Sequence, residues 1–295
     1  MRRYVLSVSL AALVVLIWPA TALAATPPVG LGTAGNFAVL AGTPNITNSG
    51  PTWISGQLGI APGCAMNGFA GASTGVKHRC DAVALKAKTD LKTAYLDAAG
   101  RSGCTALAGG LLGGLTLVSG VYCASSGADL IGTVTLSGKG VFIFQIGSQL
   151  TAEVSSRVHL INGANPCQVF WQVTSTAVIK SSSAFVGTIM ALTSVTMGTR
   201  ATLEGRALAR NGSVTLLTNR IIQPGGCGYN APPVGTSPGG TLPASLGFSL
   251  FIPSNGVPPE LRGEEFPWLL VIGAGAGLGA TGLVLINRRR RRHTA

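Results

Sequence analysis

Charged and aromatic residues are scarce in this chain. Asp, Glu, Lys and Arg make up 10% of its 295 residues, and aromatic residues make up 6%. Between positions 31 and 229 there are two histidines, His78 and His159, and six acidic residues. Those acids are Asp81, Asp90, Asp97, Asp129, Glu153 and Glu204. They are scattered along the chain, so no cluster predicts general acid–base catalysis of the kind that glycan-cleaving enzymes need.

The short motifs that carry chemistry are also absent. The sequence has no GxxxxGK, HExxH, GxSxG or EF-hand pattern, and no CxxC or HxxxH spacing. We therefore expect no enzyme activity, no cofactor, no metal site and no small-molecule substrate. The isolated Glu153 and Glu204 lie near Arg157 and Arg206, and we expect them to form ion pairs there.

Positive charge is concentrated at the two ends. The formal net charge is +12, but seven arginines lie in the first and last segments, and residues 25–265 hold fourteen Lys and Arg against nine Asp and Glu. Binding to nucleic acid requires Lys and Arg clustered on the folded domain. No such cluster is present, so a nucleic-acid partner is excluded.

The ends read as targeting and anchoring segments. Residues 1–24 have two arginines, an apolar run and a small-residue cleavage pattern, which predicts a secretory signal peptide, with an uncleaved anchor as the alternative. Residues 266–287 are long and apolar enough for a transmembrane helix, and a buried core helix is disfavoured by four glycines. Five consecutive arginines in the 288–295 tail predict a cytoplasmic C-terminus by the positive-inside rule. The protein is thus expected to be exported and held as a single-pass protein of the cell membrane, with its N-terminal domain outside.

A folded domain is expected over residues 25–230. The following segment, 231–265, is rich in Pro, Gly and Ser and has too little apolar surface to offset the entropy of ordering it, so it predicts a stalk. Six cysteines lie in the exported part, an even number in an oxidising compartment. Many pairings are possible, and neighbours in chain order favour Cys64 with Cys80, Cys104 with Cys123, and Cys167 with Cys227.

One helix and many short strands are predicted in this domain. Apolar residues recur every three or four positions from Asp81 to Ala99, with polar residues between them and Gly100 at the end. After Gly100, apolar segments separated by glycines and polar pairs at regular intervals are typical of an all-β architecture. We expect the helix to lie along the strands and bury its single apolar stripe.

An internal repeat selects the kind of β fold. Residues 187–191 (GTIMA) return as 205–209 (GRALA) eighteen residues later, and 194–196 (SVT) return as 213–215 after nineteen. Sandwiches and barrels need no fixed sequence period, whereas a solenoid reuses one coil. The sequence therefore predicts a β-solenoid with three short strands in a coil.

Small hydroxylated residues recur at equivalent places in the predicted coils. Stacking would turn them into a rigid array, because strands lie about 4.8 Å apart and alternate residues share a face. The candidates for a binding surface are Thr174, Thr176, Thr193, Ser194, Thr196, Ser213 and Thr215. The alternative is that Thr and Ser simply suit exposed strand positions.

Seven blocks of sequence, in order, resemble the DUF3494-type ice-binding protein family. They begin with LGTAGNFAVLAG at 31–42 and ISGQLGIAPG at 54–63, and continue through DLKTAYLDAAGR, LGGLTLVSGVY, VFIFQIGSQLT and NPCQVFWQV to the repeat at 185–216. The resemblance implies a discontinuous right-handed β-solenoid of triangular section with the helix packed alongside. It also implies adsorption to ice through one β face.

The family's ice face often carries a Thr-Ala/Gly-x-Thr/Asn pattern, which the present sequence only approximates at 193–196 and 212–215. The stretch 33–36 (TAGN) fits the letters but belongs to the opening block, which can face elsewhere. The sequence is therefore compatible with two functions. The first is a membrane-tethered, antifreeze-like protein whose partner is the surface of an ice crystal. The second is a cell-surface adhesion or envelope-structural solenoid without ice activity.

Overall fold

The computed structural model describes residues 26–70, 72 and 74–227. Within them the chain forms two β-sheets and one long helix, and all the strand pairs are parallel. The signal peptide, stalk, transmembrane segment and arginine tail predicted from the sequence lie outside this part of the chain. Among the described residues, no helix is long and apolar enough to cross a membrane.

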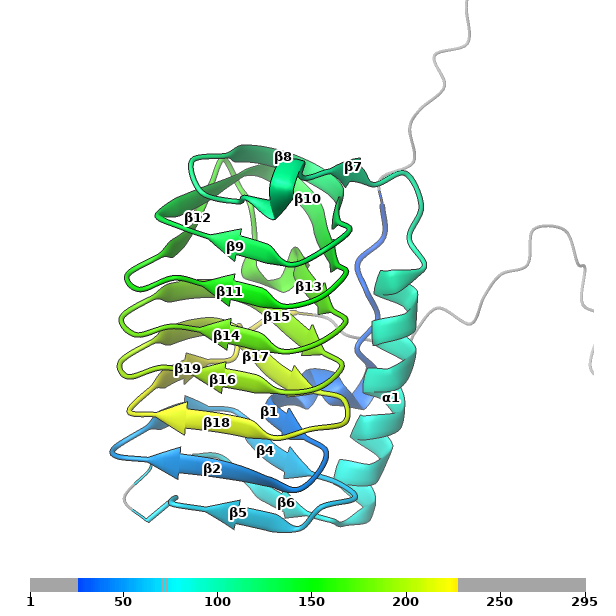
Figure 1. Cartoon of the computed structure of the whole chain (residues 1–295). Helices are drawn as coiled ribbons and strands as arrows, with labels where there is room; N and C mark the ends of the chain where they lie inside the picture. Colours follow the sequence, from blue (N-terminus) through cyan, green and yellow to red (C-terminus); the bar gives the residue numbers. More distant parts are fainter. Residues whose placement is uncertain (1–25, 71, 73, 228–295) are drawn as a thin grey trace, which may run out of the picture. The chain divides into compact units, whose positions relative to one another are not determined.

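A seven-stranded sheet forms one side of the stack (Figure 1). In spatial order its strands are β5 (Ala65–Asn67), β2 (Asn45–Ser49), β18 (Val214–Leu217), β16 (Val195–Met197), β14 (Ala177–Ile179), β11 (Leu150–Ala152) and β9 (Ala128–Leu130).

A twelve-stranded sheet forms the rest of the wall. Its main path runs through β6 (Lys77–Arg79), β4 (Gln57–Ile60), β1 (Phe37–Ala41), β17 (Thr202–Ala209), β15 (Ala184–Ala191), β12 (Arg157–Ile161), β10 (Thr133–Ile146), β8 (Thr116–Ala124) and β7 (Thr105–Ala106). Off this path, β13 (Val169–Val173) pairs with β10 and β15, and β19 (Arg220–Ile222) pairs with β17 and β3 (Trp53–Ser55).

The order of the coils differs from the order of the sequence. β1, β2 and β3 stack directly on β17, β18 and β19, as the register pairs Val39–Ala207, Thr47–Thr215 and Trp53–Arg220 show. The chain therefore starts inside the stack, winds through β4, β5 and β6 to one end, and passes along α1 to β7 and β8 at the other end. It then winds back to meet its own beginning (Figure 1). This arrangement is a discontinuous solenoid, as expected, while its right-handedness and triangular section stay predictions.

The sequence repeat corresponds to two neighbouring coils. Gly187 pairs with Gly205 and Ala191 with Ala209, so the two repeated segments are β15 and β17 lying side by side. A Cβ atom on Gly205 would lie 1.9 Å from the carbonyl oxygen of Gly187, which no side chain can occupy. The recurring glycine is therefore required by the close approach of the two strands.

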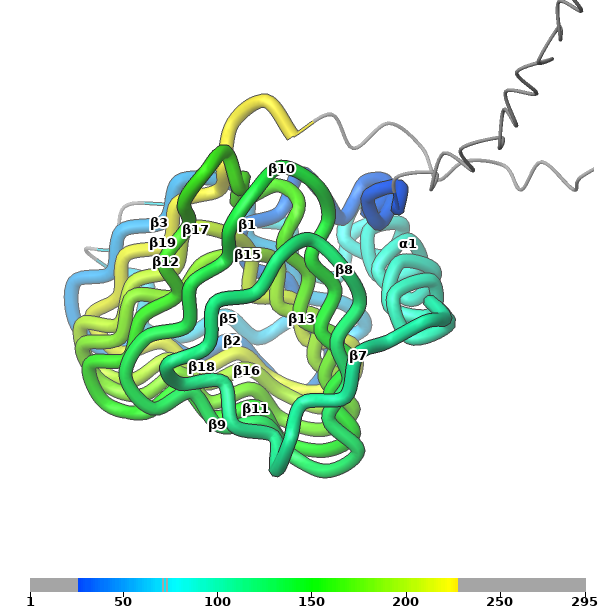
Figure 2. Tube along the Cα trace, turned by 90° about the horizontal axis from the view of Figure 1, so that it is seen from above, coloured from blue at the N-terminus to red at the C-terminus, as the bar shows by residue number. Residues whose placement is uncertain are grey.

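The helix α1 (Ala82–Ala99) lies beside the stack, as predicted (Figures 1 and 2). It begins at Asp81, whose carboxylate accepts a hydrogen bond from the Ala84 N–H at 2.8 Å. Its buried residues are Ala84, Ala87, Leu91, Ala94, Tyr95 and Ala98, which are nearly the same positions that the sequence pattern indicated. Several of them pack in one apolar cluster with Ile143, Phe170, Met190 and Leu208 of the twelve-stranded sheet.

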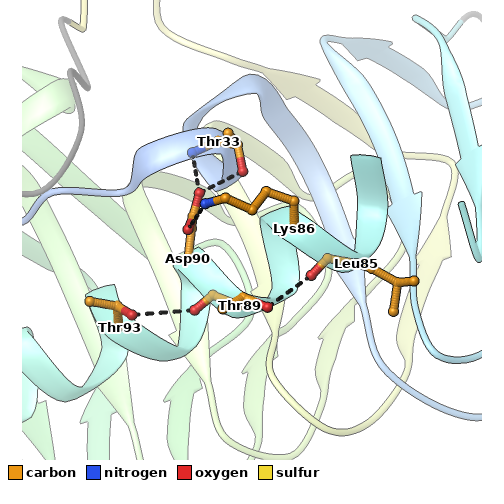
Figure 3. A network of polar contacts seen from close by, with 6 residues as sticks. All are labelled: Thr33, Leu85, Lys86, Thr89, Asp90 and Thr93. Atoms are coloured by element: carbon orange, nitrogen blue, oxygen red, sulfur yellow. Dashed lines mark hydrogen bonds and ion pairs between the residues drawn. The ribbon is translucent and has the colours of Figure 1, made fainter. Parts of the chain in front are cut away.

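Polar contacts fix α1 to the first turn of the described chain. The 3-10 helix η1 (Gly32–Asn36) contains Thr33, whose backbone N–H and hydroxyl donate to one carboxylate oxygen of Asp90 at 2.8 and 2.6 Å. Lys86 pairs with the other oxygen, and the Thr89 and Thr93 hydroxyls donate to backbone carbonyls one turn earlier (Figure 3). Thr33 of the 33–36 stretch thus holds the helix, and the stretch lies outside the seven-stranded sheet.

The interior of the stack is apolar and aromatic. The Trp171 ring stacks on Phe144 with a centroid distance of 3.9 Å, and Tyr122 and Phe185 continue the series on either side. The Trp171 Nε1–H donates to the Val186 carbonyl at 2.9 Å, so its only polar group is satisfied.

All three expected disulfides are present: Cys64–Cys80, Cys104–Cys123 and Cys167–Cys227. The expected ion pairs of Glu153 and Glu204 were wrong. Glu153 pairs with Lys180 from the next coil, at 2.7 Å, because parallel stacking brings that side chain closer than Arg157. Arg206 is buried, and its Nε–H donates to the Gly35 carbonyl at 3.0 Å.

Candidate functional site

The seven-stranded sheet has one buried and one outward-facing side. Because side chains alternate along each short strand, every second one points inward. The inward side chains are apolar and fully buried, as in Ile46, Val214, Val195, Ala177 and Leu150. The residues between them face outward. We call this outer side the seven-strand face.

The first row of outward residues runs across the sheet through six strands. The register aligns Thr151, Val178, Thr196, Thr215, Thr47 and Asn67 in that order, and of these Thr151 is largely covered, with 9% of its surface exposed. Neighbours in the row are separated by the strand spacing of about 4.8 Å. The hydroxyls of Thr47 and Thr215 are 3.4 Å apart, so the two side chains hold one another in place.

A second row lies beside the first and consists of the residues two positions earlier in the chain. It contains Gln149, Thr176, Ser194, Ser213, Asn45 and Ala65. The first four immediately precede β11, β14, β16 and β18, and backbone hydrogen bonds continue the stacking there, from the Ala177 N–H to the Ser194 carbonyl at 2.9 Å and from the Val195 N–H to the Ser213 carbonyl at 3.1 Å; Asn45 and Ala65 are paired in register. The hydroxyl oxygens of Thr176 and Ser194 are 3.2 Å apart, and the Gln149 amide donates to the Thr151 hydroxyl at 3.0 Å. The two rows together make a grid of short side chains.

Charge is confined to the margin of this grid. Asp129 extends the first row at the β9 end, where it pairs in register with Thr151. The Glu153–Lys180 ion pair lies just beyond the ends of β11 and β14. The twelve positions of the two rows themselves are uncharged, so an uncharged, regularly spaced surface could approach them without desolvating an ion.

Five of the seven residues predicted from the sequence lie in these rows: Thr176, Ser194, Thr196, Ser213 and Thr215. Thr174 and Thr193 lie instead in the bends that precede β14 and β16. The Thr174 hydroxyl donates to the Ile146 carbonyl at 3.1 Å, and the Thr193 N–H donates to the Ser175 carbonyl at 3.0 Å. Both are exposed, but they stand at the edge of the grid.

Seven of the twelve grid positions were not predicted from the sequence. The missed residues are Gln149, Thr151, Val178, Asn45, Thr47, Ala65 and Asn67. One signal was available, because residues 45–47 (NIT) have the same polar–apolar–Thr order as 194–196 and 213–215 (SVT). Nothing local, however, indicated that this N-terminal strand stacks on the C-terminal one.

Titratable groups in the described part of the chain do not form a reactive cluster. The His78 Nδ1 atom lies 2.8 Å from the Asp81 carboxylate, and the Ala84 N–H that caps there lowers the pKa of Asp81. No group of three His, Cys, Asp or Glu side chains that could hold a metal ion occurs among the described residues. The arrangement can present a patterned surface, and we find no constellation in it for bond making or breaking.

Comparison with known proteins gives consistent matches. A family described as Ice-binding-like matches residues 39–222. An ice-binding protein of Nostoc sp. (strain HG1) is 44% identical over 197 residues, covering 65% of this chain and 72% of the relative. An ice-binding protein of Flammulina populicola is 30% identical over 225 residues, covering 68% of this chain and 90% of the relative.

Solved structures agree with this result. The crystal structure of an ice-binding protein from an Antarctic biological consortium matches with a TM-score of 0.64 and 42% identity, covering 67% of this chain and 92% of the other. The DUF3494 domain of ice-binding protein 1 from Shewanella frigidimarina matches with a TM-score of 0.62 and 29% identity, covering 67% and 98%. Matched over most of its described length in both sequence and structure, the chain belongs to the Ice-binding-like family.

Proposed function

We propose that this protein binds ice through the seven-strand face and is held at the cell surface while it does so. The observation that carries the proposal is the grid of two uncharged rows, rich in Thr and Ser, on parallel strands. The relatives named as ice-binding proteins support it. The function is adsorption, without enzymatic chemistry.

The grid suits a surface that must match an ordered lattice of water. Threonine offers a hydroxyl that can hydrogen-bond to water and a methyl group that disfavours disordered water beside it. β-Branched side chains have few rotamers, so little entropy is lost when they are held in place. The contacts of Thr47 with Thr215 and of Thr176 with Ser194, each between neighbours within one row, restrict them further.

Adsorption would act on ice growth in one of two ways. Growth between bound molecules curves the ice front and makes further freezing unfavourable, which gives inhibition of recrystallisation. Alternatively, binding holds the cell against ice. Both mechanisms require only that the protein stays bound to the ice surface, and neither requires a cofactor.

The proposed placement at the cell surface rests on the sequence. The signal peptide (1–24) exports the domain (25–230), the stalk (231–265) separates it from the bilayer, and the apolar segment (266–287) anchors it with the arginine tail (288–295) in the cytoplasm. A domain on such a stalk can reach ice outside the cell. Fractionation of cells with protease accessibility from outside would test this placement separately from ice binding.

Ice binding is tested by growing a single ice hemisphere in a solution of the fluorescently labelled full chain. We expect the label to enter the ice in defined patches, while a labelled globular control stays in the liquid. Recrystallisation assays on the same sample measure the effect on growth. If the wild-type chain neither enters ice nor alters its growth at high concentration, the proposal fails and the adhesion or envelope-structural function takes its place.

A further inference from the structure

A groove of about 530 Å³ lies on another side of the stack. Its floor is formed by β12, β19 and the first halves of β15 and β17, and Pro166 of the 3-10 helix η3 (Pro166–Gln168) contributes to its wall. In Figure 2 the labels β3, β19 and β12 lie on the side away from α1. We call this site the charged groove.

Two rows of outward side chains cross the floor of the charged groove. In the first row the register aligns Arg220, Thr202, Ala184 and Arg157, so the two arginines are three strand spacings, or about 14 Å, apart. In the second row Ile222, Glu204 and Val186 are aligned, and His159 lies two residues beyond Arg157 on the same side of β12.

The ionisable side chains of the groove form no ion pairs with other side chains of the described domain. Of the five other acids in the described chain, four are paired: Asp81 with His78, Asp90 with Lys86, Asp97 with Arg101, and Glu153 with Lys180, while Asp129 at the margin of the grid is not. Within the described residues, Arg157, His159 and Glu204 are exposed and have no hydrogen bond or ion pair through their side chains. Arg220 is also exposed and stacks over the ring of Trp53 at 4.9 Å, a contact that leaves its N–H donors available.

We propose that the charged groove binds an acidic polysaccharide, one that carries carboxylates along a chain of sugar rings. Arg157 and Arg220 would each donate to a carboxylate, since the guanidinium fork matches that group. Glu204, lying between them, accepts hydrogen bonds from sugar hydroxyls, and His159 can accept or donate. Val186 and Ile222, which line the groove, offer apolar surface to the faces of the sugar rings.

The backbone of the groove argues for a glycan over a peptide. Extended peptides usually bind a sheet by adding a strand at an open edge. Here β15 and β17 are hydrogen-bonded to strands on both sides, so a ligand lying on them can meet side chains only. A glycan is recognised in that way along its whole length. A nucleic acid is disfavoured because it carries a phosphate at every nucleotide and DNA has no hydroxyl along its chain that could donate to Glu204, whereas a polyuronate has free hydroxyls beside each carboxylate.

The first test is affinity electrophoresis of the full chain in gels containing polygalacturonate, a polyuronate, with neutral dextran gels as reference. We expect retardation by polygalacturonate at low salt that weakens as salt is added. Arg157→Gln and Arg220→Gln should each raise the dissociation constant about tenfold, because each removes a charge-assisted hydrogen bond.

Arg200→Gln is the matched control, since Arg200 is an exposed arginine in a turn outside the groove and loses the same charge. If it weakens binding as much as Arg157→Gln, the attraction is unspecific and the proposal is overturned. Absence of retardation of the wild type, or equal affinity for poly-glutamate or duplex DNA, also overturns it. Thr196→Tyr on the seven-strand face should leave polygalacturonate binding unchanged.

A second measurement uses the unmutated protein and so does not depend on how the variants fold. Phenylglyoxal modifies exposed arginines, and mass mapping reports which ones react. Polygalacturonate should protect Arg157 and Arg220 at least several-fold while Arg200 reacts at its usual rate. Equal protection of all three arginines, or none, contradicts the assignment of the groove.

Discussion

Replacing Thr196 by tyrosine is the sharpest test of the seven-strand face. Thr196 lies inside the grid, with Val178 and Thr215 on either side in its row at about 4.8 Å, and with Ser194 two positions earlier in the chain at about 6.7 Å. A tyrosine ring would stand above all of these side chains. Ice is rigid, so the ring would hold its surface away from the neighbours as well as from position 196.

The size of the effect follows from the spacing of the grid. Twelve positions spaced by about 4.8 by 6.7 Å cover about 400 Å². The four positions closest to the ring make up a third of this area, and a flat crystal tilted by the ring also loses contact beyond them. We therefore expect ice shaping to be abolished. An exposed substitution changes stability by about 0.5 kcal/mol or less, which for a domain of this size shifts the melting temperature by only about 1–2 °C.

The assay compares ice shaping and recrystallisation inhibition with the thermal melt of the same sample. Thr202→Tyr on β17 and Ser181→Tyr in the turn after β14 are matched controls, because both positions lie outside the seven-stranded sheet. Both controls should behave as the wild type. If Thr196→Tyr shapes ice normally while a control variant does not, the protein binds ice through a different side and the reasoning about the grid is refuted.

Three further predictions concern the fold. Burial, together with repulsion from Arg210, lowers the pKa of Lys88 to about 7, so below that pH its charge opposes folding. The folded state releases this proton at lower pH than the unfolded state does, and stability should rise by about 2 kcal/mol from pH 7 to 9. Urea melts of Lys88→Met should show no such rise in the free energy of unfolding. If the variant and the wild type gain the same stability from pH 7 to 9, the prediction is wrong. Replacing both Cys167 and Cys227 by Ser should lower the free energy of unfolding by roughly 4 kcal/mol in denaturant melts, since the disulfide joins residues 60 apart. A loss below about 1 kcal/mol would show that this disulfide does not stabilise the stacked coils. Trp171→Ala should cost about 3–5 kcal/mol because the ring is fully buried against Phe144, whereas an equal loss in Trp53→Ala would refute the packing argument.

Local patterns in the sequence determined much of this protein. The helix from Asp81 follows from the spacing of its apolar residues and a capping carboxylate, which are properties of a few adjacent turns. The stacking of β15 on β17 follows from a repeat in which Gly205 must leave room for the Gly187 carbonyl. The cysteine pairs closed between neighbours in chain order, and the family resemblance covered nearly the whole described domain.

Tertiary structure alone decided how the coils are ordered and which side chains meet on each side. Thr47 contacts Thr215 across 168 residues of sequence, and a parallel ladder could in principle accept any extended strand at that place, so no local pattern indicates the partner. The same long-range stacking completed the seven-strand face with β2 and β5. It also places Glu153 beside Lys180, with which it forms an ion pair, and Glu204 between two arginines of the charged groove. Residue type and spacing predict elements and their buried sides, but the register between distant coils is set only when the whole stack closes, because each row depends on strands from both halves of the chain.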